Sequence, residues 1–156
     1  MLYNFINKML DFNSHEKFMK LALQLAKQAY EEDEVPIGAL VVCKNQIIGK
    51  GYNQVQRLKD ATAHAEMLAI TAASEYLNSK YLKECTLYVT IEPCIMCAGA
   101  LKWAQIDKIV YGAKEEKMGF QSKKVDIFYP KVEILSGILE MECRDLIQQF
   151  FREKRD

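Results

Sequence analysis

Short apolar runs alternate along this chain with segments of helical periodicity. Ile37–Cys43 is apolar and rich in β-branched residues, which is typical of a strand buried on both faces, and Thr86–Ile91 has the same character. Lys44-Asn45 is predicted to form a two-residue turn into a second strand, Gln46–Tyr52. Because such a hairpin is antiparallel, the pattern predicts an α/β fold, a three-layer α-β-α sandwich around a central, mixed five-stranded sheet.

The remaining expected elements are two strands and four helices. The strands are Lys108–Tyr111 and Val132–Leu135, and the helices are Ser14–Glu32, Thr62–Leu77, Cys94–Ala104 and Ile138–Arg152. Ser14 and Thr62 are expected as N-caps. His15, in the first predicted helical turn, is expected to be a solvated surface residue.

The composition favours one globular domain over residues 1–156. Half of the 156 residues are hydrophobic and 27% are charged, which excludes a disordered chain. Lys plus Arg and Asp plus Glu number 21 each, so the net charge of zero excludes a strongly basic nucleic-acid binder and leaves only a local patch. Neither a signal peptide nor an apolar run of about 20 residues is present, so we expect a cytoplasmic protein without a membrane segment.

The five cysteines do not have the pattern of a secreted disulfide framework, because their number is odd and only Cys94 and Cys97 are closely spaced. Cys43, Cys85 and Cys143 lie in apolar patterns and are expected as buried core thiols. A Cys₃His metal site through one of these three nevertheless remains an alternative.

Two short motifs, His64-Ala65-Glu66 and Pro93-Cys94-Ile95-Met96-Cys97, carry the chemistry. Cys94 and Cys97 share one face of a helical turn at a helix N-terminus, where the thiolate form is favoured. With His64 they supply three ligands for Zn²⁺, and the open fourth position is typical of a catalytic zinc. A Cys₂His₂ finger is disfavoured, because the chain has two histidines and none follows Cys97.

Glu66 is badly placed as a further ligand, because residues two apart do not share a helix face. In a first helical turn its carboxylate can instead lean over the open position and move a proton as a general base. The complete arrangement, H-x-E…P-C-x-x-C, is that of zinc-dependent nucleobase deaminases. A structural zinc site or a redox-active CxxC is the alternative interpretation.

On these motifs the chain resembles the cytidine-deaminase-like superfamily and, within it, the bacterial tRNA-specific adenosine deaminases. The resemblance covers residues 18–154 and is carried by EVPIGALVV at 34–42, TAHAEMLAI at 62–70 and LYVTIEPCIMCAGAL at 87–101. It implies one Zn²⁺ per subunit on His64, Cys94 and Cys97, Glu66 as the proton shuttle, and Asn53 as a contact to the target base. The implied activity is hydrolytic deamination of adenosine to inosine at the first anticodon (wobble) position of tRNA, by a homodimer that holds the anticodon stem-loop across its interface.

Glu115, Phe150, Phe151 and Arg152 are candidate RNA contacts. Aromatic rings can stack on bases and cations can meet phosphates, although the end of the last helix is equally consistent with cations placed for the helix dipole and one core aromatic. Ala61 and Glu115 depart from the Pro and Asp common in the family.

Two alternative functions remain. One is a deaminase of cytosine, guanine or a nucleoside or nucleotide with the same zinc site. The other is a non-catalytic subunit that binds RNA or a partner, and the presence of Glu66 argues against it.

Overall fold

The computed structural model describes residues 1–124 and 126–155. One sheet runs through the molecule with the strand order β2-β1-β3-β4-β5. The strands are β1 (Gly38–Cys43), β2 (Gln46–Tyr52), β3 (Cys85–Ile91), β4 (Lys108–Ala113) and β5 (Glu133–Ser136). The helices are α1 (Leu2–Glu31), α2 (Val55–Leu58), α3 (Ala65–Leu77), α4 (Ile95–Trp103), the 3₁₀ helix η1 (Phe120–Lys123) and α5 (Glu140–Arg155).

The sheet is mixed because of the β1–β2 hairpin. β1 is antiparallel to both β2 and β3, whereas β3, β4 and β5 are parallel to one another. The predicted turn is confirmed: Lys44 and Asn45 have φ values of 49° and 63°, and a two-residue hairpin turn of this kind needs a positive φ at both positions.

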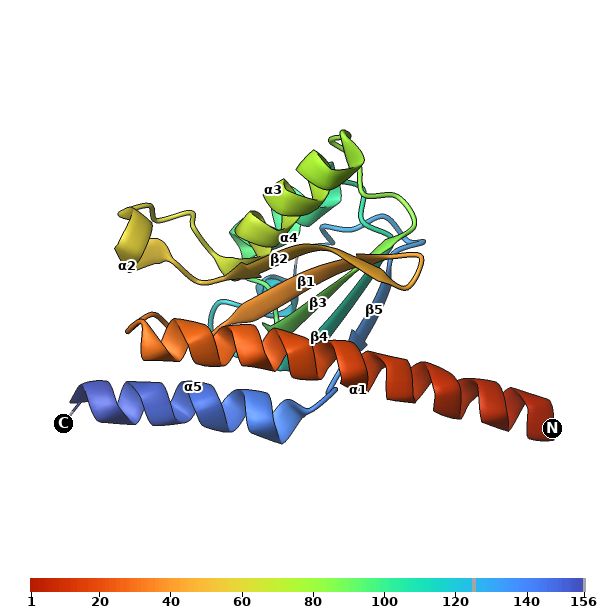
Figure 1. Ribbon diagram of the computed structural model, residues 1–156, viewed down its shortest axis with the longest axis horizontal. Helices are drawn as coiled ribbons and strands as arrows, with labels where there is room; N and C mark the ends of the chain where they lie inside the picture. Colours follow the sequence, from red (N-terminus) through yellow and green to blue (C-terminus); the bar gives the residue numbers. More distant parts are fainter. Residues whose placement is uncertain (125, 156) are drawn as a thin grey trace.

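Helices cover both faces of the sheet, as Figure 1 shows, with α3 and α4 on one side and α1 and α5 on the other. Alternate residues of β1 belong to the two cores. Ala39 and Val41 pack beneath α3 and α4, whereas Leu40 and Val42 pack against α1 and α5. The expected three-layer α-β-α sandwich with a mixed five-stranded sheet is therefore confirmed.

Helix α3 lies unusually close to β2, and two glycines make this approach possible. A Cβ at Gly49 would collide with the helix backbone at Ala69 and Ala73, and one at Gly51 would collide with it at Ala65 and Ala69. Because α3 rests directly on the strand, its N-terminus is fixed relative to the sheet.

The start of the chain differs from the prediction. α1 begins at Leu2 rather than Ser14, since the first 13 residues contain neither Gly nor Pro to interrupt a helix. Ser14 is consequently inside the helix and is not its N-cap. The expectation that His15 is solvated is also wrong: it is 5% exposed, and its Nδ1 lies 2.8 Å from the Tyr88 hydroxyl. His15 precedes the buried Phe18, Met19 and Ala22 by three, four and seven residues, and so shares their helix face.

The second predicted N-cap is displaced as well. Thr62 donates its hydroxyl to Asp60, and His64 occupies the N-cap position of α3. Two short helices, α2 and η1, lie outside the helices and strands predicted from the sequence. Among the described residues, no helix combines the length and apolar composition needed to cross a bilayer.

Candidate active site

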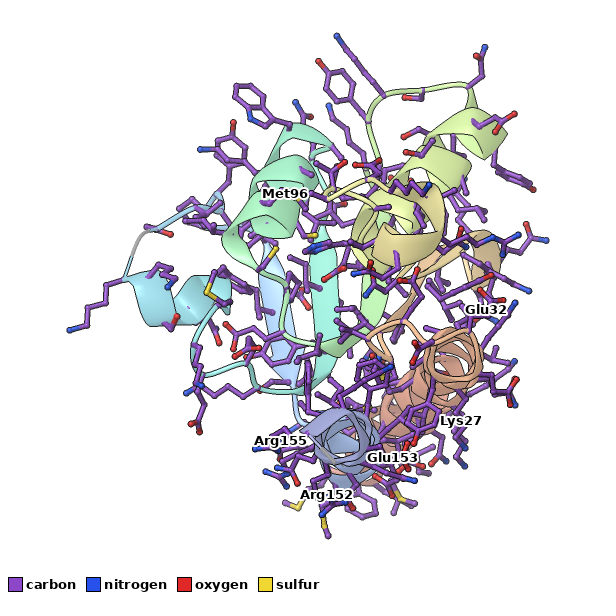
Figure 2. The ribbon with its side chains drawn as sticks, turned by 90° about the vertical axis from the view of Figure 1, so that its left-hand side faces the viewer. Lys27, Glu32, Met96, Arg152, Glu153 and Arg155 are labelled. Atoms are coloured by element: carbon purple, nitrogen blue, oxygen red, sulfur yellow. The ribbon has the colours of Figure 1, made fainter. Side chains whose placement is uncertain are left out.

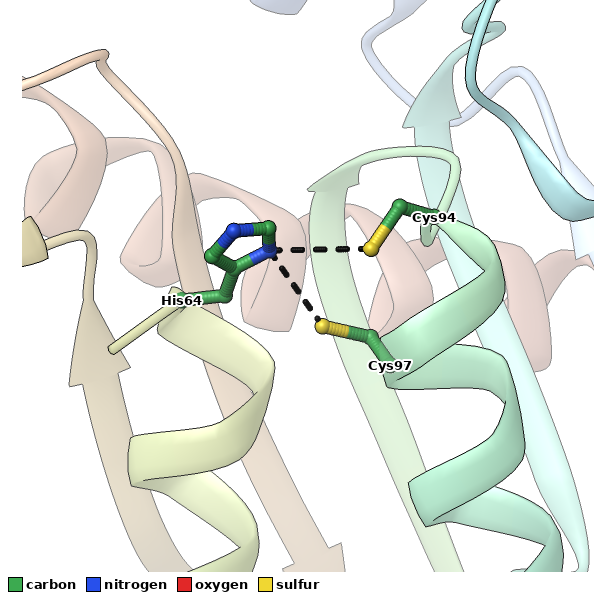
Figure 3. Close-up of side chains that lie close together, drawn as sticks. All are labelled: His64, Cys94 and Cys97. Carbon is green, nitrogen blue, oxygen red and sulfur yellow. Dashed lines mark hydrogen bonds between the residues drawn. The ribbon is translucent and has the colours of Figure 1, made fainter. Parts of the chain in front are cut away.

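Two helix N-termini meet at the end of the sheet where β3 finishes. His64 is the N-cap residue of α3 and Cys94 that of α4, both with extended backbone, and Cys97 lies one turn into α4. The His64 Nδ1 atom is 3.6 Å from the Cys94 Sγ and 3.5 Å from the Cys97 Sγ (Figure 3). The three side chains thus converge on one point from two neighbouring helices.

This convergence fits a zinc ion. In a tetrahedral site with Zn–N of about 2.0 Å and Zn–S of about 2.3 Å, the nitrogen and sulfur ligands are about 3.5 Å apart. One ligand atom from each of His64, Cys94 and Cys97 lies within 4.8 Å of the others, and in residues 1–124 and 126–155 no other such group of His, Cys and carboxylate side chains occurs. A Cys₃His site through Cys43, Cys85 or Cys143 therefore has no support from the described part of the chain.

The Cys94 thiol is polarised toward metal binding, whereas the Cys97 thiol is not. The pKa of Cys94 is lowered to about 4, chiefly because Cys97 hydrogen-bonds to its sulfur, with His64 adding to the effect. The pKa of Cys97 is raised, first by the same hydrogen bond and then by burial. The pKa of His64 is raised, chiefly by its hydrogen bond with Cys94. The lowered pKa favours the thiolate form of Cys94, which is the form that binds a metal.

Glu66 is buried beside these ligands, in the first turn of α3. It is 2% exposed, and its Oε2 is the single buried side-chain oxygen or nitrogen of the described residues that has no hydrogen-bond partner. Burial raises the pKa of this carboxyl group to about 7. Since a buried oxygen without a partner is costly, Oε2 has the position expected of an atom that binds a ligand or water.

A cavity of about 840 Å³ opens onto His64, and Asn53 lies in its wall. The Asn53 side chain is oriented by the backbone: Nδ2 donates to the Val35 carbonyl at 3.3 Å, and Oδ1 accepts from the Val55 N–H at 3.3 Å. One amide hydrogen and one oxygen lone pair remain for a ligand. The volume lies in the range of small-molecule and cofactor sites.

Two buried carboxylates that support the site were missed by sequence reasoning. Glu34 accepts the N–H groups of Gln56 and Arg57 and so fixes α2 at the rim of the cavity. Glu92 accepts the N–H groups of Glu115 and Gln121 and so holds their loop against the turn that carries Cys94. Both side chains are 1% exposed. Glu92 adjoins the P-C-x-x-C motif, which was the one available signal, whereas nothing local distinguishes Glu34.

The candidate RNA contacts lie in different places. Phe150 is buried against Tyr30, with ring centroids 5.8 Å apart, and lines the His64 cavity. Phe151 and Glu115 line a second groove, of about 990 Å³, and Glu115 also accepts the Lys117 N–H at 2.9 Å. Arg152 is exposed and lines neither space; Figure 2 shows it on the side of α5 away from the sheet.

Three convergent ligands that leave one coordination position free, with a buried carboxylate beside them, define the class of zinc-dependent nucleobase deaminases. Within that class, the chain belongs to the family of the cytidine and deoxycytidylate deaminase zinc-binding region, whose model matches residues 12–113.

Three similar proteins show which kinds of deaminase this chain resembles. The chain is 54% identical over 146 residues to the tRNA-specific adenosine deaminase of Aquifex aeolicus (strain VF5), covering 90% of this chain and 96% of that protein. A structure from a study of A-to-I editing by tRNA:A34 deaminases is 38% identical, with a TM-score of 0.78, over 83% of this chain and 98% of the other. The guanine deaminase of Bacillus subtilis is 35% identical, with a TM-score of 0.63, over 73% and 71% of the two chains.

Proposed function

We propose that this chain is a zinc-dependent tRNA adenosine deaminase that hydrolyses adenosine to inosine and ammonia at the wobble position. Residues 1–156 act as one deaminase domain. The observation that carries the chemistry is the convergence of His64, Cys94 and Cys97 beside the unpartnered oxygen of Glu66. The substrate is inferred from the Aquifex enzyme, which matches this chain over nearly its whole length.

In this mechanism His64, Cys94 and Cys97 would hold one Zn²⁺ per subunit. When bound, the ion would supply the Lewis acidity that makes water a competent nucleophile near neutral pH. Glu66 would receive a proton from the attacking water and deliver it to N1 of the adenine ring. It would then take the proton of the new hydroxyl group at C6 and pass it to the departing amine, which leaves as ammonia. Asn53 orients the base with the hydrogen and lone pair that the backbone leaves free.

The buried position of Glu66 also keeps bulk water from its carboxylate, so that Oε2 is reserved for the reacting groups. The target base must leave its stack to enter the cavity, and unstacking costs little in a single-stranded anticodon loop.

The anticodon stem-loop would continue from the cavity into the 990 Å³ groove between the residue 113–117 loop and α5. This groove brings several cations together with the exposed ring of Phe151, and this combination suits phosphates and unstacked bases. The cations are Lys114, Lys117, Arg144, Lys154 and Arg155, and they outnumber the carboxylates that line the same groove, which are Glu115, Glu116 and Glu140. The zero net charge of the whole chain is thus compatible with a local basic surface.

The working form would be a cytoplasmic homodimer. One side of α4 supports a subunit interface, because Ile95 is 45% and Trp103 80% exposed. Gly99 lies between them in the sequence, and an added Cβ there would meet no atom within 4 Å. An exposed apolar strip with open space beside a helix is suited to burial against a second subunit.

A deaminase of free guanine is the second candidate. The similarity to the Bacillus subtilis guanine deaminase favours it, since its solved fold extends over most of this chain. A shared fold and metal site do not select the substrate.

A comparison of substrates tests the proposal. Zinc-loaded protein is incubated with an anticodon stem-loop that carries a first-position adenosine and, separately, with free bases and nucleosides. Inosine in the stem-loop alone supports the tRNA enzyme. Deamination of guanine or cytosine alone would replace it with a small-molecule deaminase, and no turnover on any substrate would indicate a binding subunit.

A further inference from the structure

Two cysteines outside the metal centre face each other across the sheet. Cys43 ends β1 and Cys85 begins β3, and the antiparallel register pairs them directly. Both side chains lie on the face covered by α3 and α4, and the Cys85 thiol donates to the Lys83 carbonyl at 3.5 Å. They are adjacent in space although they are far apart in the sequence.

The backbone makes this pair especially close. The Cys85 N–H donates to the Leu82 carbonyl, and the Cys85 carbonyl accepts from the Asp107 N–H at 3.3 Å, so neither group bonds to Cys43. Directly opposed residues of this non-hydrogen-bonded kind have Cα atoms about 4.5 Å apart. That separation is at the short end of the range of about 4.4–6.8 Å that a disulfide spans.

We propose that Cys43 and Cys85 form a reversible cross-strand disulfide when the folded protein meets an oxidising small-molecule disulfide. The two thiols differ in access as the reaction requires, since Cys43 is partly exposed whereas Cys85 is 1% exposed. An oxidant therefore reaches Cys43 first, and Cys85 is the resolving thiol.

The disulfide would form by thiol–disulfide exchange in two steps. The Cys43 thiolate attacks one sulfur of the oxidant RSSR, forms a mixed disulfide and releases one RS⁻. Cys85 then loses its proton and attacks the Cys43 sulfur, which closes the protein disulfide and releases the second RS⁻. Overall, two protein thiols are oxidised to one disulfide while RSSR is reduced to two RSH.

The second step is expected to be the slower one. Burial raises the pKa of Cys85 to about 12, and the neighbouring Cys43 contributes further. The Cys43 contributions disappear once its sulfur is in the mixed disulfide, while the burial effect remains. The mixed disulfide should therefore accumulate before the Cys43–Cys85 disulfide forms.

The pair is remote from the metal centre. Cys85 stands at the start of β3, whereas Cys94 follows the end of this strand, and seven strand residues span about 23 Å. Oxidation can consequently proceed with His64, Cys94 and Cys97 occupied by metal. Because Cys43 is partly exposed and exposed disulfides are readily reduced, small thiols should reverse this one.

The test uses zinc-loaded protein treated with excess glutathione disulfide, quenched with acid, alkylated and digested with chymotrypsin. Cleavage after Tyr88 separates Cys85 from Cys94 and Cys97. We expect a cross-linked pair of peptides containing Cys43 and Cys85, lighter by two hydrogen atoms than the separate peptides, which dithiothreitol removes. Cys143, buried and without a thiol neighbour in the described structure, is the internal control and should stay unmodified.

Two matched variants assign the order of events. Cys85→Ser should retain glutathione on Cys43, and Cys43→Ser should leave Cys85 free. The proposal is overturned if wild-type Cys43 and Cys85 are both recovered as free thiols, if Cys43 keeps glutathione indefinitely in the wild type, or if Cys43 links only to a second chain. Should a variant not fold, the wild-type cross-link alone decides between these outcomes.

Discussion

The carboxylate of Glu92 lies directly against Gly119, in a space that no side chain at position 119 could share. A Cβ there would collide with Glu92 Oε2 and with the Glu115 carbonyl. The same loop contacts the metal-ligand turn, because the Phe120 N–H donates to the Pro93 carbonyl at 3.0 Å. Glu92 thus stabilises the position of Cys94 indirectly: it holds the loop that contains Gly119, and this loop contacts the start of α4.

Gly119→Ala should therefore destabilise the protein and reduce activity together. Forcing a methyl group into a packed site costs about 1–3 kcal/mol, and here the displaced loop borders Cys94. Urea unfolding and initial rates of inosine formation measure the two effects. Met118→Ala is the control, because its side chain is 55% exposed and should change the unfolding free energy by no more than about 0.5 kcal/mol. Equal stability of the two variants would contradict this role of Glu92 and Gly119.

Glu66→Gln should retain zinc and lose activity. The amide keeps the size of the side chain but cannot accept and return a proton, so we expect a loss of about 10²- to 10⁴-fold in turnover. Metal analysis and single-turnover rates distinguish the two properties. Cys97→Ala is the matched comparison, since it should lose both zinc and activity. Full activity in Glu66→Gln would remove Glu66 from the mechanism.

Local sequence patterns predicted much of this structure. All five strands were located within two residues at each end, because their apolar runs are short and bounded by turns. His64, Cys94 and Cys97 are brought together as expected, since their spacing places all three at helix N-termini. The strands depend on residues near one another in the chain, whereas the metal site was predicted from the H-x-E…P-C-x-x-C pattern, which joins residues about 30 positions apart.

Long-range contacts could not be predicted in the same way. Glu34 is buried with partners because α2, more than 20 residues later in the chain, donates two N–H groups to it. His15 is buried because Tyr88, on the central strand β3, lies beneath it. A charged or polar residue is usually exposed, and its partner is not identifiable until the fold places the two together.

His15 should make stability depend on pH. Its pKa is lowered from its ordinary value, first by burial and then by the Lys108 ammonium, against opposing effects of Asp11 and Glu133. As the pH falls through about 6.5, the unfolded chain binds a proton that the folded protein does not, so folding stability decreases. Urea unfolding of the wild type and His15→Gln between pH 7 and pH 5 should show the steeper loss in the wild type.

The control for this titration is Tyr88→Phe, which removes the hydroxyl bonded to His15 but keeps the imidazole. Losing one buried hydrogen bond should cost about 1 kcal/mol across the whole pH range while the pH slope persists. Parallel stability curves for the wild type and His15→Gln would show that His15 does not carry the effect.

The first turns of α1 should be dispensable for folding. The apolar side chains Leu2, Tyr3, Phe5 and Leu10 are all at least 60% exposed, so residues 1–10 bury little against the rest of the chain. Deleting them should change the unfolding free energy by no more than about 0.5 kcal/mol and should reduce aggregation, because an exposed apolar patch is lost.

A deletion through Met19 is the matched comparison for this truncation. It also removes Phe18 and Met19, which are 4% and 0% exposed, and truncating each such core side chain costs about 2–5 kcal/mol. Because a whole domain is stable by only about 5–15 kcal/mol, the longer deletion should not fold cooperatively. Urea unfolding and size-exclusion chromatography separate the two cases. A loss above about 1 kcal/mol from the shorter deletion would mean that residues 1–10 are packed in solution, against a second copy of the chain or another surface.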